Sequence, residues 1–218
     1  MNPLTSAIIV SLKTSMISTM LCALIALPVA VVIAQNSFKG KELLIIVLQT
    51  LLAIPTVVVG LTVYALICRG AALGSLGLLF TQTAIVIGQC LLALPIMIMY
   101  AYNAIAALCK EVSDTARTLG ASGLQTGALV LSEARHGILA AIAATFGRLI
   151  GEVGVSMMLG GNIAGYTRTM TTSIALETSK GEFVLGLQLG GILLAIALGV
   201  NICLRRLLIL QRRAAERV

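Results

Sequence analysis

Charged and aromatic side chains are scarce in this sequence. Charged residues make up 11% of the 218 residues, and tryptophan is absent, whereas about 25% of the residues in a soluble domain are charged. Hydrophobic residues reach 59%, above the roughly 45–50% of soluble domains. Because so few charges cannot cover that much apolar surface in water, the composition excludes a soluble enzyme, a disordered chain and a secreted disulfide scaffold. It indicates a polytopic integral membrane protein, with residues 1–218 forming one transmembrane domain.

Groups that carry catalysis or bind metals are equally scarce. The five cysteines are far apart and form no C-x-x-C pair, and His136 is the only histidine, so ordinary zinc-site spacing is missing. No nucleophile–base pair is evident, and the phosphate-binding pattern G-x-x-x-x-G-K-[ST] does not occur. We therefore expect no catalytic residues, no metal site and no cofactor bound by this chain.

Five apolar runs are long enough to cross a bilayer, which takes about 20 helical residues. They cover residues about 14–34, 43–68, 78–100, 138–160 and 184–204. Lys13 borders the first run, where it either snorkels to the interface or faces protein. Pro28, Pro55 and Pro95 fall within the first three runs, and proline usually kinks a spanning helix. The predicted fold class is an all-α membrane protein with five transmembrane helices.

Most basic residues lie on one side of these five helices. The loops at 35–42 and 101–137 and the C-terminal tail together carry ten of the 15 Lys and Arg residues, and the opposite side carries three. The positive-inside rule then puts the N-terminus outside and the C-terminus in the cytoplasm. No basic patch is interleaved with aromatic residues. We therefore expect membrane lipid, and no nucleic acid, as a partner.

The third loop has helix-capping residues on both sides of a glycine. Ser113 is predicted to cap a short helix that begins at Asp114, and Gly120 to end that helix in the left-handed conformation. Ser122 and Gln125 have the spacing of a capping box, which opens a second helix. The resulting helix, corner and helix form either a knob that docks in another protein or a connector on the membrane surface.

The stretch Asp-Thr-Ala-Arg-Thr-Leu-Gly, which begins at Asp114, resembles the EAA loop of membrane permeases of ABC importers. Asp114 takes the acidic position, Ala116 the second alanine and Gly120 the glycine, preceded by Leu119, while a threonine replaces the first alanine. In that family the loop is the coupling helix, seated in a cleft of the cytoplasmic ATPase subunit. The resemblance therefore implies that residues about 108–137 form a cytoplasmic ATPase-coupling loop.

Two ionisable residues lie near the middle of the fourth run. Arg148 and Glu152 are four residues apart, on one face of a helix. Charges at mid-membrane cost about 2.5–3.5 kcal/mol each even on the lenient insertion scale, so they pair or face an aqueous path. The two residues are either a structural ion pair inside the bundle or part of a translocation pathway and its gate.

The segment that follows the fourth run is rich in hydrogen-bond donors. It includes Asn162, Thr167, Arg168, Thr169, Thr171, Thr172 and Ser173. Hydroxyls and one guanidinium can donate to a tetrahedral dianion without a dense cage of positive charge, so we place Asn162, Thr167, Arg168 and Thr171 in the pathway or gate. Residues 151–165 are similar to the molybdate, sulfate and tungstate branch of these permeases, and residues 166–183 are most similar to the tungstate permeases.

This resemblance implies a function. The chain is expected to be the permease subunit of a tungstate importer in the prokaryotic plasma (inner) membrane, with the type I ABC importer permease fold. It would form the pathway as a homodimer, with two cytoplasmic ABC ATPase subunits that use ATP and Mg, and with an extracytoplasmic tungstate-binding protein. The alternatives are a molybdate or sulfate permease of the same architecture and, from a different class, a passive anion channel or a membrane scaffold.

Overall fold

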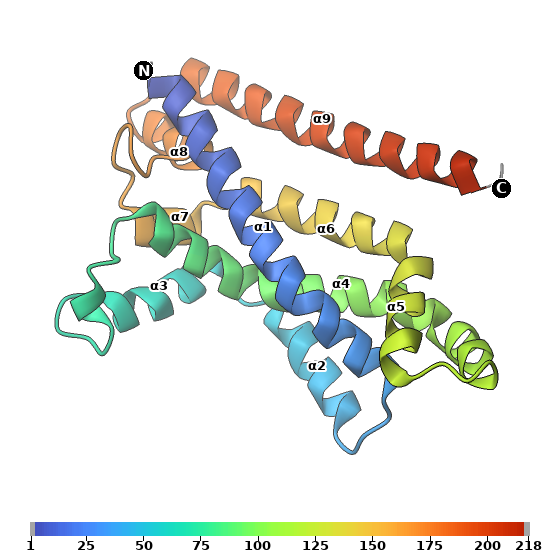
Figure 1. The fold of residues 1–218 in the computed structure, drawn as a ribbon. Helices are drawn as coiled ribbons and strands as arrows, with labels where there is room; N and C mark the ends of the chain where they lie inside the picture. Colours follow the sequence, from blue (N-terminus) through green and yellow to red (C-terminus); the bar gives the residue numbers. More distant parts are fainter. Residues whose placement is uncertain (1–2, 216–218) are drawn as a thin grey trace. The chain divides into compact units, whose positions relative to one another are not determined.

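The computed structural model describes residues 3–215, and within this range every regular element is a helix (Figure 1). The helices are α1 (Pro3–Gln35), α2 (Lys41–Leu51), α3 (Thr56–Ile67), the short 3-10 helix η1 (Gly74–Leu76), α4 (Gln82–Thr118), α5 (Gly123–Glu133), α6 (Arg135–Ile150), α7 (Gly154–Gly160), α8 (Met170–Ser179) and α9 (Phe183–Ala215). The prediction of an all-α chain is therefore confirmed.

Three of these helices are long and apolar enough to cross a membrane by themselves. They are α1 over Leu4–Gln35, α4 over Gln82–Cys109 and α9 over Phe183–Cys203. Two bent pairs are further candidates, α2 with α3 and α5 with α6. The described part of the chain thus has three candidate spans, or up to five if each bent pair counts as one, and only the second count agrees with the prediction.

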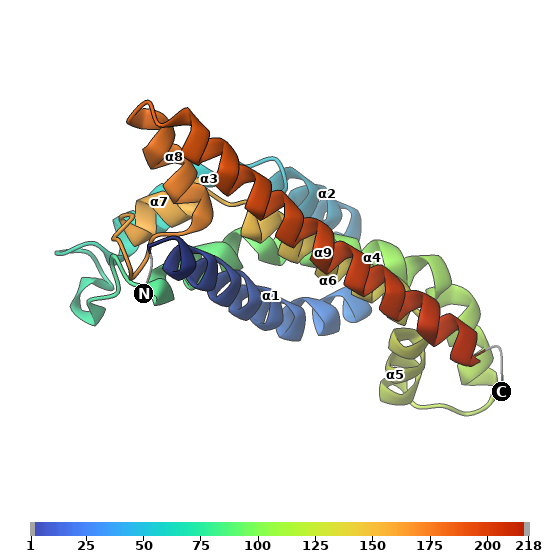
Figure 2. The ribbon, with the colours of Figure 1, turned by 90° about the horizontal axis from the view of Figure 1, so that it is seen from above.

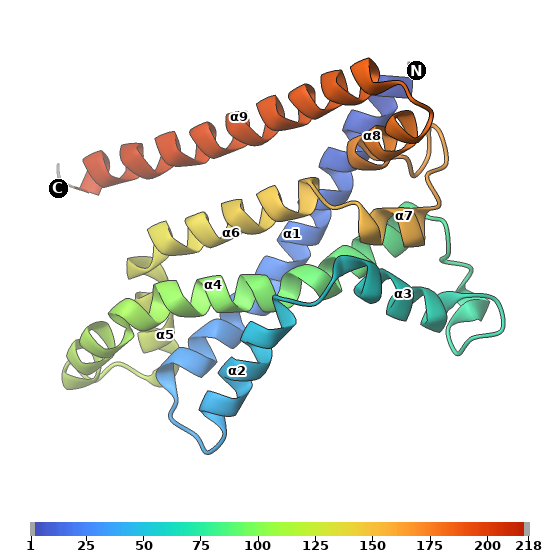
Figure 3. The same cartoon turned by 180° about the vertical axis from the view of Figure 1, so that it is seen from behind.

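The second apolar run is not one helix, which corrects the span predicted over 43–68. The structure has two separate helices there, α2 and α3 (Figure 3). The bend at the break between them is 96°. Pro55 precedes α3 with a φ of −60° and a ψ of 131°, an extended conformation, and a proline ring also disfavours helix in the residue before it. Pro28 and Pro95, in contrast, lie inside α1 and α4.

The fourth apolar run is also divided, which corrects the span predicted over 138–160. α6 ends at Ile150 and α7 begins at Gly154, whereas the bent candidate span combines α5 with α6 at 69°. At the break, a carboxylate oxygen of Glu152 accepts a hydrogen bond from the backbone N–H of Val155 at 3.2 Å. This bond satisfies a first-turn N–H of α7 that has no partner within the helix.

The helix α4 is longer than the third run predicted at 78–100, and it removes one predicted cap. It continues without interruption to Thr118, because no glycine or proline follows Pro95 within it. Ser113 is therefore buried inside α4, with its Oγ 3.6 Å from the Sγ of Cys109. The prediction that Ser113 caps a separate short helix is wrong, and much of the third loop is helical.

The chain divides into two compact units, which are described separately. Unit 1 consists of Met1–Leu21, Ile54–Ala93 and Phe146–Val200, and unit 2 of Cys22–Ala53, Leu94–Thr145 and Asn201–Val218. The apolar core of unit 2 comes from α1, α4, α5 and α6, and its buried members are Ala30, Val31, Ala101, Ile105, Cys109, Val130, Ala134 and Ile138. This core fixes α5 against α1 and the second half of α4.

In unit 1, the seven-residue helix α7 packs tightly against α3 and α4, because glycines replace side chains at the contacts. A Cβ added to Gly60 of α3 would lie 3.1 Å from the Cβ of Met158, and one added to Gly154 would lie 2.6 Å from the Oγ1 of Thr56. A Cβ on Gly88 of α4 would overlap side chains of α7. Only glycine allows this close approach.

Candidate functional site

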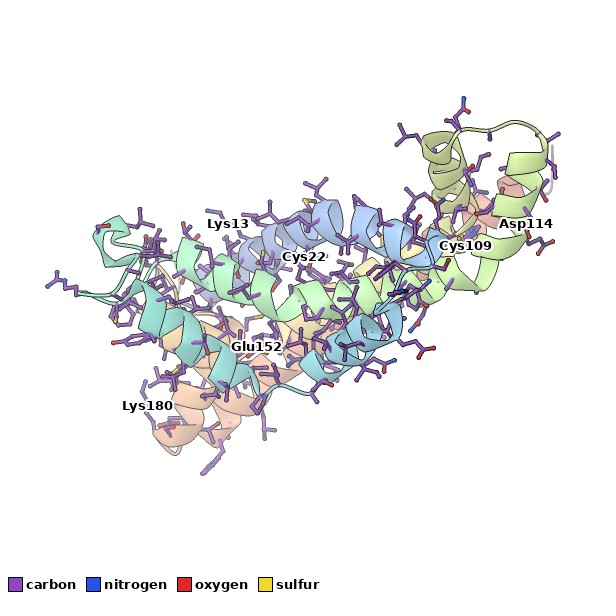
Figure 4. The ribbon with its side chains drawn as sticks, turned by 90° about the horizontal axis from the view of Figure 1, so that it is seen from below. Lys13, Cys22, Cys109, Asp114, Glu152 and Lys180 are labelled. Carbon is purple, nitrogen blue, oxygen red and sulfur yellow. The ribbon has the colours of Figure 1, made fainter. Side chains whose placement is uncertain are left out.

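Arg148 and Glu152 form an ion pair at the break between α6 and α7. An Nη1 of Arg148 lies 2.7 Å from Oε2 of Glu152. The Glu152 side chain is 2% exposed and the Arg148 side chain 43%, and Glu152 lies inside the ribbon of unit 1 (Figure 4). A buried carboxylate is costly without a partner, and a guanidinium that reaches the surface supplies one. Pairing, one of the two arrangements predicted for these residues, is thus observed.

Glu152 is also connected to α8 through its backbone. The hydroxyl of Thr171 donates to the carbonyl oxygen of Glu152 at 2.8 Å. Thr171 lies in the first turn of α8, where Thr169 and Thr172 form a capping box by exchanging hydrogen bonds between side chain and backbone. These hydrogen bonds therefore connect the end of α6, the start of α7 and the start of α8 through Glu152.

A second group of predicted residues closes the loop between α7 and α8. The Thr167 hydroxyl donates to the Gly160 carbonyl and accepts from the backbone N–H of Ile163. Arg168 donates from Nε to Oδ1 of Asn162 at 3.0 Å and from Nη2 to the Asn162 carbonyl at 3.2 Å. Asn162 itself has a φ of +51°, a left-handed conformation that asparagine tolerates better than most residues.

The hydroxyls of this segment, which the sequence indicated as donors for an anion, lie inside the protein. All five are buried, and each forms at least one hydrogen bond within the protein; they belong to Thr167, Thr169, Thr171, Thr172 and Ser173. Buried polar groups in native proteins are normally satisfied in this way. The Thr167 and Thr171 hydroxyls bind backbone carbonyls outside α8, and the other three stabilise the first turn of α8. Arg148 and Arg168 keep partly exposed cations.

Sequence reasoning missed a polar face of α1 in unit 1. The Oγ of Ser11 accepts from the backbone N–H of Met170 at 2.8 Å, and Ser18 donates to Oε1 of Gln89 at 2.9 Å. The spacing of Ser11, Ser15 and Ser18 places all three on one helix face, and all three are buried. That spacing is the signal that could have revealed a hydrogen-bonded interface in place of a lipid-facing helix.

In unit 2, a short loop turns the chain from α4 into α5 (Figure 2), and Gly120 lies in this loop. Its φ is +82°, which confirms the predicted left-handed conformation. The capping box is confirmed as well. The backbone N–H of Ser122 donates to Oε1 of Gln125 at 2.8 Å, and the backbone N–H of Gln125 donates to Oγ of Ser122 at 3.4 Å. The predicted corner and second helix are therefore present.

The corner presents apolar side chains to its surroundings. Leu119 is 82% exposed and Leu124 89%, and Asp114 is also exposed (Figure 4). Ala116, by contrast, is buried, and its carbonyl accepts from the backbone N–H of Ala121 at 3.0 Å. Leu119 and Leu124 are thus exposed on both sides of the turn, and Ala116 contributes backbone structure to it.

The predicted residues therefore fall into two sites. The group Arg148, Glu152, Asn162, Thr167, Arg168 and Thr171 belongs to unit 1, and the group Asp114, Ala116, Leu119 and Gly120 belongs to unit 2. Among the described side chains, no cluster of three or more His, Cys, Asp or Glu could hold a metal ion. Within the described residues, no disulfide joins any of the five cysteines.

The fold has a counterpart among solved structures. It is that of a type I ABC importer permease, because the chain superposes on a chain of the inward-facing MetNI methionine ABC transporter with a TM-score of 0.74. The match covers 94% of each chain at 16% sequence identity. At that identity the likeness concerns the fold alone.

The sequence then fixes the family. Residues 26–214 match the family described as binding-protein-dependent transport system inner membrane component, and the chain belongs to that family. It is an integral inner membrane protein and a permease subunit of the ABC transporter class.

Three relatives have similar length. A probable anion ABC transporter permease protein of Haloferax volcanii is 38% identical, over 91% of this chain and 88% of its own. The tungstate uptake system permease protein TupB of Campylobacter jejuni is 41% identical, over 78% and 71%. TupB of Peptoclostridium acidaminophilum is 36% identical, over 89% and 85%.

Proposed function

We propose that this chain is the membrane-spanning subunit of an ATP-driven tungstate importer. The observation that carries the proposal is the 41% and 36% identity to two permeases named for tungstate uptake. Relatives named for molybdenum and sulfate transport share 28% and 25%. The oxyanion class is common to all of these names, and the tungstate branch is favoured by the higher identity.

The exposed corner at Gly120 supports coupling to an ATPase. A left-handed glycine fixes the turn, and Leu119 and Leu124 project from it as apolar contacts for a partner. The chain lacks a phosphate-binding loop of its own, so two cytoplasmic ABC ATPase subunits would bind ATP and Mg. Closure of those subunits would act on Asp114, Ala116, Leu119 and Gly120, and an extracytoplasmic binding protein would deliver the anion.

Two copies of the chain would enclose the pathway, with the N-terminus outside and the C-terminus in the cytoplasm. In α9 only 11% of the apolar window is buried, which supports a further contact with a second copy or with lipid. The orientation rests on the excess of basic residues in the third loop and the tail. Four arginines of that tail have side chains outside the described residues, namely Arg205, Arg212, Arg213 and Arg217.

Within each copy, Arg148 would contribute to the pathway or its gate. One of its nitrogens is bound to Glu152, and the half-exposed guanidinium has further donors for a passing anion. The buried Glu152 would hold that guanidinium in place and reduce the local positive charge, so that the anion binds weakly enough to leave. Asn162 and Arg168 would also contribute to the pathway, while Thr167 and Thr171 hold the surrounding helices.

Reconstitution of the chain with its ATPase and binding protein in proteoliposomes tests this function. Uptake of tungstate is measured with and without ATP, and with molybdate and sulfate as competitors. We expect tungstate uptake that requires ATP and that molybdate and sulfate inhibit less strongly than unlabelled tungstate does. Flux without ATP, or no association with an ATPase, would contradict the proposal and favour a channel or a scaffold.

The second candidate is a molybdate or sulfate permease of the same architecture. It is favoured by the relatives of H. volcanii and Salmonella typhimurium, named for molybdenum and sulfate, which cover 88% and 87% of this chain. In the same experiment, ATP-dependent uptake that prefers one of these anions would select this candidate and keep the coupling argument.

A further inference from the structure

Lys13 lies on an apolar face of α1 without a counter-ion. It is exposed, and its neighbours on that face, Ile9, Met16, Ile17 and Met20, are exposed and apolar. Within the described part of the chain it has no hydrogen-bond or ion-pair partner. Its side chain projects away from the ribbon of unit 1 (Figure 4). A cation placed in this way in a membrane protein is a functional-site hypothesis, because its desolvation is costly.

The depth of Lys13 puts its ammonium near the edge of the hydrocarbon core. The apolar window Leu4–Gln35 has 32 residues, roughly 48 Å of helix against a core of about 30 Å. Lys13 is nine residues after Leu4, roughly 14 Å along the axis. It therefore lies within reach of dissolved anions and of lipid headgroups.

A groove beside Lys13 offers additional hydrogen-bond donors. It has a volume of about 380 Å³ and is lined by Lys13, Thr14, Ile17, Leu21, Gln82, Thr83 and Val86, all of them in unit 1. This volume falls in the range of about 300–1,000 Å³ that is common for small-molecule sites. The lining residues come from α1 and from the first two turns of α4, and none of them is a carboxylate.

The donors in the groove suit an anion. Lys13 offers three N–H donors, and Thr83 is an exposed residue whose hydroxyl is a further donor. Gln82 uses one N–H of its amide to bind the Tyr166 carbonyl at 2.7 Å, which fixes its side chain at the groove and leaves the second N–H. The Thr14 hydroxyl is committed to the carbonyl of Val10, so it does not take part.

We propose that the groove between α1 and α4 is a binding site for a tetrahedral oxyanion group, held by the ammonium of Lys13 together with the side chains of Thr83 and Gln82. The group has two possible sources with the same chemistry. One is the free oxyanion, in which case this site rests on the proposed function and is a second contact for the cargo besides Arg148. The other is the phosphate of an anionic lipid.

The experiment uses the assembled transporter, permease with ATPase, and two readouts. In nanodiscs of phosphatidylcholine, bound tungstate is counted by equilibrium dialysis without ATP or binding protein. In detergent, native mass spectrometry counts retained phosphatidylglycerol. For K13M we expect at least about tenfold weaker tungstate binding, or the loss of one retained lipid per permease chain, because a charge-assisted hydrogen bond is removed. K13R should restore most of either signal.

Matched controls separate the site from general charge effects. K39M removes the same charge from an exposed lysine outside the groove and should leave both readouts unchanged. T83V, at an exposed residue, tests the groove independently if K13M does not fold. The proposal is overturned if folded K13M and T83V bind tungstate and phosphatidylglycerol as the unchanged transporter does, or if K39M has the same effect as K13M. The lipid readout stays decisive even if the transporter takes up no tungstate.

Discussion

Glu152 makes three contacts that serve different elements. Its two carboxylate oxygens bind Arg148 and the N–H of Val155, and its carbonyl accepts from Thr171. Because the side chain is buried, water does not take the place of a partner that is removed, and the carboxylate is left unsatisfied. This residue therefore determines both the local stability of the α6–α7 break and the position of the Arg148 guanidinium.

We predict that E152Q lowers the free energy of unfolding by about 1.5–3 kcal/mol, the contribution of a hydrogen bond to a charged group. R148A should cost more, because it leaves a buried carboxylate without a counter-ion. Thermal unfolding of the purified permease in detergent measures both effects, and proteoliposome uptake should fall in both variants.

The matched control for this pair is E177Q. Glu177 pairs with Lys180 at 3.0 Å on the surface, and exposed pairs contribute about 0–1 kcal/mol. If E152Q is as mild as E177Q in unfolding and in uptake, Glu152 has neither of the roles given to it.

Individual residues were predictable where a local rule governs them. Arg148 and Glu152 were expected to pair or to face water because an isolated charge is costly in a membrane, and they pair. The sequence places Thr167 and Thr171 in the pathway or gate as donors, and in the structure both hydroxyls are buried and donate to backbone carbonyls. A hydroxyl suits an anion and a backbone carbonyl equally well, so the sequence alone could not distinguish the two.

Among the elements, the corner at Gly120 depends on backbone conformation alone. A Cβ on Gly120 would meet nothing within 4 Å, so space does not require glycine there. The φ of +82° does, because the left-handed region costs other residues roughly 1–2 kcal/mol. The direction in which α5 leaves α4 is thus set by one residue.

We predict that G120A destabilises the permease by roughly 1 kcal/mol and weakens its co-purification with the ATPase, because the corner changes direction. G123A is the control. Gly123 also has open space around a Cβ, but its φ is not positive, so the change should be neutral or stabilise by about 0.4–1 kcal/mol. Equal ATPase binding by the two variants would show that the corner does not direct coupling.

Helix ends were predictable when both partners of a motif are close in the sequence. Ser122 and Gln125 form a complete capping box three residues apart, and the structure contains it. Ser113 had only its own side chain to indicate a cap, and the helix α4 continues through it. Of three prolines in apolar runs, Pro55 alone stands at a helix break. Whether a proline breaks a helix or lies inside it is decided by tertiary packing, which no local pattern encodes.

At the scale of the whole molecule, the orientation in the membrane can be tested with the native thiols. Cys68 ends the α3 helix and Cys203 lies at the end of the apolar window of α9, and both are accessible to some degree. The predicted topology puts Cys68 outside and Cys203 on the cytoplasmic side. Alanine at the other four positions in turn gives two single-cysteine variants.

We predict that a membrane-impermeant maleimide labels the Cys68 variant in intact cells and the Cys203 variant in inverted vesicles. Charge asymmetry fixes this expectation, since most Lys and Arg residues lie on the side of Cys203. A membrane-permeant maleimide, which should label both variants in both preparations, controls for buried thiols. The reverse pattern would invert the topology and place the Gly120 corner away from the ATPase.

The close packing of α7 has a mechanical consequence. A Cβ at positions 60, 88 or 154 would crowd its contacts with α3 and α4, so α7 has little room to slide or tilt by itself. We therefore expect α3, α7 and the adjoining part of α4 to move together as one block when access near Arg148 changes. The seven residues of α7 would then be a fixed packing element. Motion would be confined to the bends at Pro55 and beside Glu152.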